Sequence, residues 1–272
     1  MAEIYQARYW QPLDDKKVEC RLCPHHCRLQ PGQTGRCKAR NNVDGRLIAW
    51  SYGKITSLAL DPIEKKPLSF FRPGSKILSA GSFGCNFHCD FCQNWTISQQ
   101  EAQWRLIGPD ELVDMAVKMI PQGNIGLAFT YNEPLISMEY VQDCASLAQA
   151  KGLVNVVVTN GFADPGPWAD LLPLIDAFNI DLKAWQDSFY RTICGGGIET
   201  VKQNIKSAAA VCHVEVTTLL LPGLNDSEAD IDQLAAWIAG IKPNIPLHLN
   251  RHHPDYQCLD TPPISRDRKS VV

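Results

Sequence analysis

Short apolar runs alternate with longer amphipathic segments from Lys76 to Asn250. Six runs have the length and the β-branched content of buried strands: 76–79, 125–130, 154–159, 178–182, 214–221 and 246–250. Five segments between them have helical periodicity: 110–120, 135–151, 167–175, 199–211 and 227–241. Strands that alternate with helices predict right-handed βαβ units and a parallel sheet covered by helices. Six units are too few for a closed eight-stranded barrel, so we expect an α/β fold with a partial (β/α)6 barrel.

The chain before this barrel has a different pattern. Short alternating runs at 46–50 and 54–60, separated by Gly53, predict a small hairpin. The segment from Asp61 to Pro67 is polar and bounded by prolines, and predicts a surface loop with solvated lysines. We therefore expect three units: a cysteine-rich knuckle and hairpin at 1–72, the barrel at 73–251 and a tail at 252–272.

The composition is that of a globular protein, with 272 residues, of which 45% are hydrophobic and 20% are charged. A formal net charge of -3 argues against binding of nucleic acid by bulk electrostatics. The N-terminus has no apolar leader, and no stretch approaches the roughly 18 apolar residues that span a bilayer. We expect a cytoplasmic protein without a membrane segment.

Three thiols lie within eight residues, at Cys85, Cys89 and Cys92, in a C-x3-C-x2-C array. Thiolates converging from one short loop suit an iron–sulfur cluster better than a structural zinc ion, which requires four closed ligands. One iron of a four-iron cluster would then lack a protein ligand. A small molecule could coordinate there, so the spacing indicates chemistry as well as electron storage.

Four further thiols, Cys20, Cys23, Cys27 and Cys37, follow a C-x2-C-x3-C-x9-C spacing inside eighteen residues. Clustered thiols with turn formers between them predict a metal site. Zinc and a second [4Fe–4S] cluster would both be satisfied by four sulfurs, so the ligand set does not choose between them. We favour the cluster slightly, because iron–sulfur assembly machinery must already handle this chain.

Polar residues follow several predicted strands, at the edge where α/β proteins bind ligands. They are found at 130–134, 159–161, 181–183 and 222–226. Each has a structural alternative: Glu133 can cap the helix that begins at Leu135, and Asp181 can simply pair with Lys183. Their coincidence at consecutive strand ends favours a ligand site beside the cysteine loop.

The cysteine loop, with Phe91 directly before the third cysteine, resembles the signature of the radical S-adenosylmethionine (SAM) superfamily. Three strand-end elements, 131–134, 181–183 and 221–226, are similar to those of the pyruvate formate-lyase activating enzyme group. The N-terminal cysteines, the 61–67 loop and Gln93–Trp95 most resemble AmmeMemoRadiSam-system radical SAM enzymes. That family continues into a further helix after Tyr256, so the resemblance implies a truncated tail.

The resemblance implies a [4Fe–4S] cluster on Cys85, Cys89 and Cys92, with SAM bound at the open iron. It places Asn132 and Glu133 at the methionyl amino group of SAM. Asp181 and Lys183 would handle the SAM carboxylate, directly or through a cation, and Phe91 would lie beside the adenine. No catalytic residue is assigned beyond the cluster.

The implied reaction is reductive cleavage of SAM to methionine and a 5'-deoxyadenosyl radical, which abstracts a hydrogen atom. It requires an external low-potential electron donor, and the group resemblance favours a protein partner that receives a glycyl radical. Radical modification of a small molecule, a peptide or RNA is the alternative, with RNA disfavoured by the lack of a basic stripe. A non-catalytic electron carrier is a third hypothesis, but it would need fully ligated clusters and no residues for a co-substrate.

Overall fold

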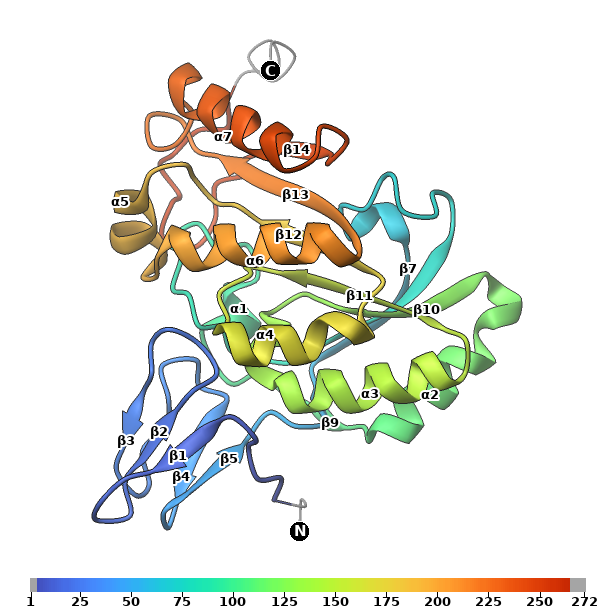
Figure 1. Cartoon of the computed structure of the whole chain (residues 1–272), viewed down its shortest axis with the longest axis vertical. Helices are drawn as coiled ribbons and strands as arrows, with labels where there is room; N and C mark the ends of the chain where they lie inside the picture. The colour runs from blue at the N-terminus through green and yellow to red at the C-terminus, as the bar shows by residue number, and fades with distance from the viewer. Residues whose placement is uncertain (1–3, 265–272) are drawn as a thin grey trace.

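The computed structural model describes residues 4–264, and its centre is a curved seven-stranded sheet (Figure 1). The strand order is β14-β13-β12-β11-β10-β8-β7. Neighbouring strands pair in parallel, except that β7 runs antiparallel to β8. The bounds are β7 Ser57–Pro62, β8 Lys76–Gly81, β10 Asn124–Phe129, β11 Val154–Thr159, β12 Ala177–Asp181, β13 His213–Leu220 and β14 Leu247–Arg251. The six predicted parallel strands and the partial barrel are confirmed.

Helices follow one another along the outer face of the sheet in Figure 1. They are α2 Pro109–Lys118, α3 Met138–Ala150, α4 Pro165–Leu171, α6 Ile198–Val211 and α7 Glu228–Ile241. The start of α7 follows the sequence signal, because the Ser227 side chain accepts a hydrogen bond from the Asp230 backbone N–H. The predicted helix at 135–151 instead opens with a 3-10 turn, Pro134–Ser137, before α3 begins.

A buried carboxylate, Glu215, lies at the amino-terminal end of the barrel strands and holds the segment that crosses this end. Glu215 on β13 accepts hydrogen bonds from the backbone N–H groups of Ser69 (3.0 Å) and Phe70 (2.9 Å). Its carboxylate also bonds the imidazoles of His213 and His248. The chain after β7 is thereby held across this end, which leaves the carboxyl ends of the strands for a ligand.

The N-terminal unit consists of short antiparallel strands. These are β1 Trp10–Pro12, β2 Val18–Cys20 and β3 Arg28–Leu29 in one sheet, and β4 Arg40–Val43 with β5 Arg46–Ala49 in a hairpin. The predicted hairpin between the runs 46–50 and 54–60 is wrong, because the first run forms β5 and pairs with β4, while the second run pairs elsewhere. Part of that run forms β6, Lys54–Ile55, which pairs with β9, Arg105–Leu106, and the rest is β7 of the main sheet. The chain division predicted at residue 73 stays a prediction.

The prediction of solvated lysines in the 61–67 loop is confirmed for Lys65 and is wrong for Lys66. Lys65 is largely exposed, but the Lys66 side chain is only 2% exposed and donates to Asp61 at 2.8 Å. The Asp61 carboxylate also accepts from the Tyr131 hydroxyl at 2.6 Å. Because β7 places Asp61 inside the sheet edge, its charge requires a buried cation.

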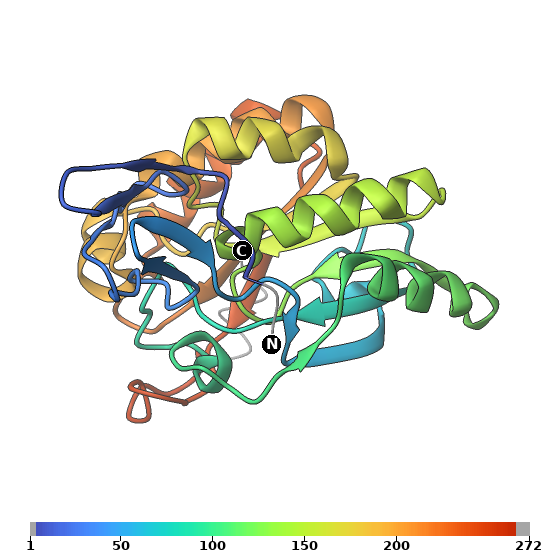
Figure 2. The same cartoon turned by 90° about the horizontal axis from the view of Figure 1, so that it is seen from below.

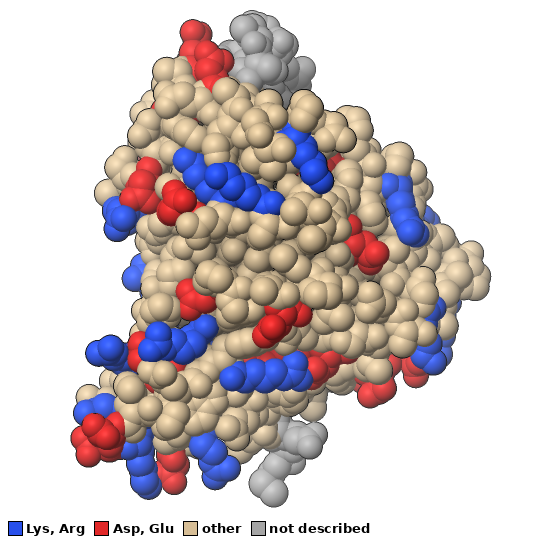
Figure 3. Space-filling model, in the orientation of Figure 1, with Lys and Arg blue, Asp and Glu red and all other residues tan. Residues whose placement is uncertain are grey.

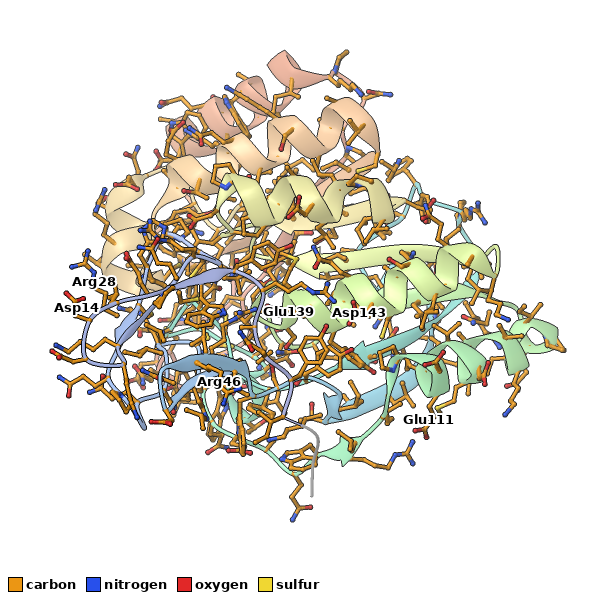
Figure 4. The ribbon with its side chains drawn as sticks, turned by 60° about the horizontal axis from the view of Figure 1, so that its bottom comes forward. Asp14, Arg28, Arg46, Glu111, Glu139 and Asp143 are labelled. Carbon is orange, nitrogen blue, oxygen red and sulfur yellow. The ribbon has the colours of Figure 1, made fainter. Side chains whose placement is uncertain are left out.

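The N-terminal unit packs beside the start of α3 in both Figure 1 and Figure 2. Figure 4 shows Glu139 and Asp143 near each other on α3, close to that unit. Glu139 is fully buried and accepts from the Arg40 guanidinium at 2.5 Å, and from the Arg8 backbone N–H at 2.8 Å. Asp143 accepts from the Tyr52 hydroxyl at 2.7 Å. Two carboxylates of one helix thus anchor the unit.

The chain after β14 returns to the cysteine loop. The Gln257 backbone N–H donates to the Asp90 carbonyl at 3.0 Å, and the Tyr256 ring stacks on Trp95 with centroids 5.2 Å apart. Residues 265–272 lie outside the described range, so the predicted truncation of the tail stays a prediction. None of the helices in the described range is long and apolar enough to cross a membrane.

Gly84 marks the closest approach of the N-terminal unit to the cysteine loop. It has φ +87°, and a Cβ there would lie 2.2 Å from the Cys37 carbonyl oxygen. We expect Gly84→Ala to lower the free energy of unfolding by about 1–3 kcal/mol more than Gly123→Ala does. Gly123 is the matched control, since it has φ +91° and nothing within 4 Å of an added Cβ. Urea unfolding of both variants checks this, and equal losses would contradict the contact.

Candidate cofactor site

A cavity of about 230 Å³ opens at the carboxyl ends of the parallel strands. It brings together every residue that the sequence assigned to the cofactors at this edge. These residues are Cys85, Cys89, Phe91, Cys92, Asn132, Glu133, Asp181 and Lys183. The cysteine loop follows β8, while the other residues come from the ends of β10 and β12. Residues far apart in the sequence therefore share one site.

The cysteine loop is held in place from β10. Asn132 accepts from the Ser82 backbone N–H at 2.9 Å and donates to the Gly84 carbonyl at 3.1 Å. Its amide is thus occupied with positioning the start of the loop. Cys85 is contacted by the Asn160 side-chain amide at 3.7 Å, and Cys92 by the Ser98 hydroxyl at 3.1 Å. Neutral donors next to thiolates tune the ligands of a metal site.

Glu133 combines a structural role with a place in the cavity wall. Its Oε1 accepts from the Thr159 hydroxyl at 2.6 Å and from the Leu135 backbone N–H at 3.0 Å, which caps the 3-10 turn. Its Oε2 accepts from the Asn160 backbone N–H at 2.8 Å. Burial raises the pKa of Glu133 to about 7, although these hydrogen bonds oppose the increase.

This raised pKa predicts a pH dependence of stability. The unfolded chain ionises Glu133 near its ordinary pKa of 4.5, but the folded protein does so only near 7. The contribution of protonated Glu133 to the free energy of unfolding is fully present below pH 4.5. It is lost as the pH rises through 7, and the total loss is about 3 kcal/mol. We expect urea unfolding of the metal-free protein between pH 5 and 8 to show this loss in the wild type but not in Glu133→Gln. Parallel pH profiles for the two proteins would contradict the assignment.

Asp181 and Lys183 form the pair that the structural alternative predicts, with Nζ 2.9 Å from Oδ2. Lys183 also lies 5.9 Å from the centroid of the Phe91 ring. Burial disfavours its ammonium, but Asp181 and the nearby thiols raise the pKa of Lys183 well above its ordinary value. The cavity therefore holds a permanent cation beside a carboxylate.

A fourth thiol, Cys194, contacts the cysteine loop, and the sequence pattern gave no sign of this contact. Cys194 is fully buried and hydrogen-bonds Cys89, and its carbonyl accepts from the His88 backbone N–H at 2.8 Å. This hydrogen bond lowers the pKa of Cys89, against the effect of burial. Cys194 ends a π-helical turn, Tyr190–Cys194, and no spacing rule connects it with residue 89. Thr217 and Asn250 line the cavity and were not predicted, whereas Tyr131 and Asn160 belong to the predicted strand-end segments 130–134 and 159–161.

The N-terminal cysteines line a second, smaller pocket. Cys20, Cys23, Cys27 and Cys37 all contribute to its wall. His25 also lines it, but its Nε2 bonds the Asn86 carbonyl oxygen at 2.8 Å, and His26 bonds Asp164 instead. Across residues 4–264, no three His, Cys, Asp or Glu side chains are arranged to hold a single metal ion. Assignment of either cysteine set to a metal therefore rests on its donor chemistry.

The fold and the cavity define an α/β partial barrel with a cysteine-loop cofactor site at the carboxyl edge of its sheet. A family model described as the radical SAM superfamily matches residues 81–235, more than half of the chain. The protein belongs to the radical SAM superfamily. The cofactors predicted for the loop, a [4Fe–4S] cluster and SAM, are those of that family. The narrower subgroup resemblances stay predictions.

Curated relatives cover the chain to different extents. The uncharacterized protein MJ0808 of Methanocaldococcus jannaschii is 41% identical over 266 residues, 95% of this chain and 77% of that protein. The benzylsuccinate synthase activating enzyme of Thauera aromatica is 26% identical over 42% of this chain and 35% of its own length. The GTP 3',8-cyclase of Peptoclostridium acidaminophilum is 26% identical over 54% of this chain and 46% of its own. The chain thus spans less than half of the two named enzymes.

A solved structure with low sequence identity supports the fold, and it supports nothing beyond the fold. Streptococcus suis SuiB bound to its precursor peptide SuiA superposes with a TM-score of 0.52 at 12% identity. The match covers 64% of this chain and 39% of SuiB.

Proposed function

We propose that this protein is a radical SAM enzyme whose Cys85, Cys89 and Cys92 hold a [4Fe–4S] cluster beside a SAM site in the same cavity. The observation that carries the proposal is the convergence of these three thiols with the five residues assigned to SAM. Three soft sulfur donors in one cavity wall fit an iron–sulfur cluster with one unligated iron. When bound, this cofactor pair supplies the electron that cleaves SAM and the 5'-deoxyadenosyl radical that removes a hydrogen atom.

The chain's own residues would bind and orient SAM. Glu133 offers a buried carboxylate to the methionyl ammonium, and a cation there would favour its ionised form. Lys183 offers a cation to the SAM carboxylate, and Asp181 keeps that cation charged and in place. Phe91 is 4% exposed and offers an apolar surface to the adenine. Asn132 acts through the start of the cysteine loop, which it holds in place.

An electron carrier is the weaker alternative. A carrier needs closed ligand sets and no cavity for a second molecule. Here the polar residues from β10 and β12 face a cavity together with an incomplete ligand set. A co-substrate site accounts for both features.

The substrate is a separate step of the proposal. We favour hydrogen abstraction from a protein partner that receives a glycyl radical, supported by the likeness to the benzylsuccinate synthase activating enzyme. Radical modification of a small molecule is the second candidate, because a GTP 3',8-cyclase matches a larger share of the chain. RNA is disfavoured: on the face in Figure 3, acidic and basic side chains are interspersed, a surface unlike the basic stripes of RNA-binding proteins.

A fractionation experiment tests the substrate class. Anaerobically reconstituted protein is reduced with a low-potential donor and supplied with SAM, and 5'-deoxyadenosine is measured with and without fractions of a cell extract. We expect the macromolecular fraction to raise the rate and protease treatment to remove the stimulation. A glycyl-radical signal in electron paramagnetic resonance should appear in the same sample.

Each other outcome selects an alternative. Stimulation by the small-molecule filtrate alone would replace the protein partner by a small-molecule substrate. Stimulation that ribonuclease removes and protease spares would indicate RNA. A Cys89→Ala protein serves as the control in every arm, since it should form no 5'-deoxyadenosine with any fraction.

A further inference from the structure

The N-terminal pocket has the donor set of a metal site that is independent of the cavity. Four thiols line it, and three of them, Cys20, Cys23 and Cys27, lie within eight residues, the same span as the three thiols of the cysteine loop. Cys20 and Cys37 are buried, while Cys23 and Cys27 are half-buried. Four free thiols that line one pocket supply the number and kind of donors that a metal centre requires.

Arg40 supplies a second and independent observation. Its side chain is 1% exposed and lines the same pocket. Nε donates to the Ile136 carbonyl at 3.2 Å and Nη2 to Glu139 at 2.5 Å, but Nη1 has no partner among the described residues. A buried N–H group without an acceptor is costly, so native structures rarely leave one unpaired. Metal-bound thiolates or bridging sulfides would give this N–H group an anionic acceptor.

The pocket shares a wall with the cavity. Asn86 lines the N-terminal pocket, while its neighbour Cys85 lines the cavity. The Asn160 side chain contacts both, with Nδ2 2.8 Å from Asn86 Oδ1 and 3.7 Å from Cys85 Sγ. Gly84 lies directly against the Cys37 carbonyl. A centre held by the N-terminal thiols would therefore lie against the first residues of the cysteine loop, 84–86.

We propose that Cys20, Cys23, Cys27 and Cys37 hold a second metal centre, an iron–sulfur cluster closed by four thiolates and charge-compensated by Arg40. Zinc shares the four-thiolate chemistry. We favour iron because the site shares a wall with the cysteine loop. An iron–sulfur cluster there could exchange single electrons with a cluster in the loop, whereas zinc is not redox-active. The choice of iron rests on the proposed function of the cavity, whereas metal binding by the four thiols does not.

Metal analysis of site variants tests the proposal without SAM. Iron, zinc and acid-labile sulfide are measured in anaerobically reconstituted wild type, in a variant with Cys85, Cys89 and Cys92 changed to alanine, and in a variant with Cys20, Cys23, Cys27 and Cys37 changed to serine. We expect about eight irons and eight sulfides per chain in the wild type, and about four of each in either variant. Cys212→Ala, a thiol outside both pockets, should keep the wild-type content.

Other results would overturn the inference and remain distinct from failure of the cavity site. About one zinc without iron in the Cys85/Cys89/Cys92 variant would make the N-terminal site a zinc knuckle. No metal in that variant, when it is folded by circular dichroism, would remove the site altogether. If the Cys85/Cys89/Cys92 variant loses all its iron and the four-serine variant keeps its iron, the second cluster is refuted. If the four-serine variant loses its iron and the Cys85/Cys89/Cys92 variant keeps the wild-type content, the cavity cluster is refuted. If the four-serine variant does not fold, the single variant Cys27→Ser should still show an altered spectrum of the reduced second cluster, and an unchanged spectrum counts against the proposal.

Discussion

Cys89→Ala is expected to reduce formation of 5'-deoxyadenosine from SAM to the background of the enzyme-free reaction. Cys89 is the central thiol of the loop, is 6% exposed, and is contacted by Cys194. A cluster held by three thiolates from one loop cannot lose one of them and keep both its stability and its single open iron. Iron content should fall by about four atoms per chain, and methionine release should disappear together with 5'-deoxyadenosine.

Cys212→Ala is the matched control for this prediction. Cys212 lies at the end of α6, where its thiol donates to the Ala208 carbonyl at 3.3 Å. It lines neither cysteine pocket. The control should therefore keep its iron and its SAM cleavage. Activity retained in Cys89→Ala at the level of this control would remove Cys89 from the cluster.

Arg40→Met is expected to lower the free energy of unfolding of the metal-free protein by about 3–5 kcal/mol. The substitution leaves Glu139, which is fully buried, without its cationic partner. The Arg8 backbone N–H still donates to Glu139, but a single neutral donor does not compensate a buried carboxylate. Because Arg40 joins β4 to α3, the substitution weakens the contact between the N-terminal unit and the barrel.

A double variant isolates the uncompensated charge from the lost packing. Arg40→Met with Glu139→Leu should recover most of the stability, since apolar side chains of similar volume often replace a buried ion pair at little cost. Arg28→Met is the exposed control, because Arg28 is 75% exposed in its pair with Glu19 and should change stability by less than about 0.5 kcal/mol. Urea unfolding gives all three values. A loss in Arg40→Met no larger than in Arg28→Met would contradict the buried pair.

The barrel was predictable because its signal is local. Strands such as β11, Val154–Thr159, are short runs rich in β-branched residues, and α7 begins after the serine that the sequence marks. The wrong predictions concern strands that pair with partners distant in the sequence. The run that forms β7 looks like half of a hairpin, but its partner is β8, beyond the 63–75 segment. Alternation shows that a strand exists and does not show which strand lies beside it.

The candidate site was predictable where its residues sit at strand ends. Glu133, Asp181 and Lys183 follow recognisable strands, so the topology alone brings them to one edge. Cys194 and Arg40 were not predictable in this way. Each is placed by the packing of a distant element: Cys194 contacts Cys89 from a π-helical turn, and Arg40 lines the N-terminal pocket from a hairpin strand. Burial of Lys66 was missed for the same reason, since it depends on where β7 places Asp61.

Cleavage of SAM by the wild-type protein tests the account most directly. The protein is reconstituted anaerobically with iron and sulfide, reduced with a low-potential donor and supplied with SAM, and the products are separated by liquid chromatography and identified by mass spectrometry. The account predicts 5'-deoxyadenosine and methionine in equal amounts, formed only when the reductant and an intact Cys85, Cys89 and Cys92 loop are both present. A protein that binds its cluster and is reduced, yet leaves SAM intact, would contradict it.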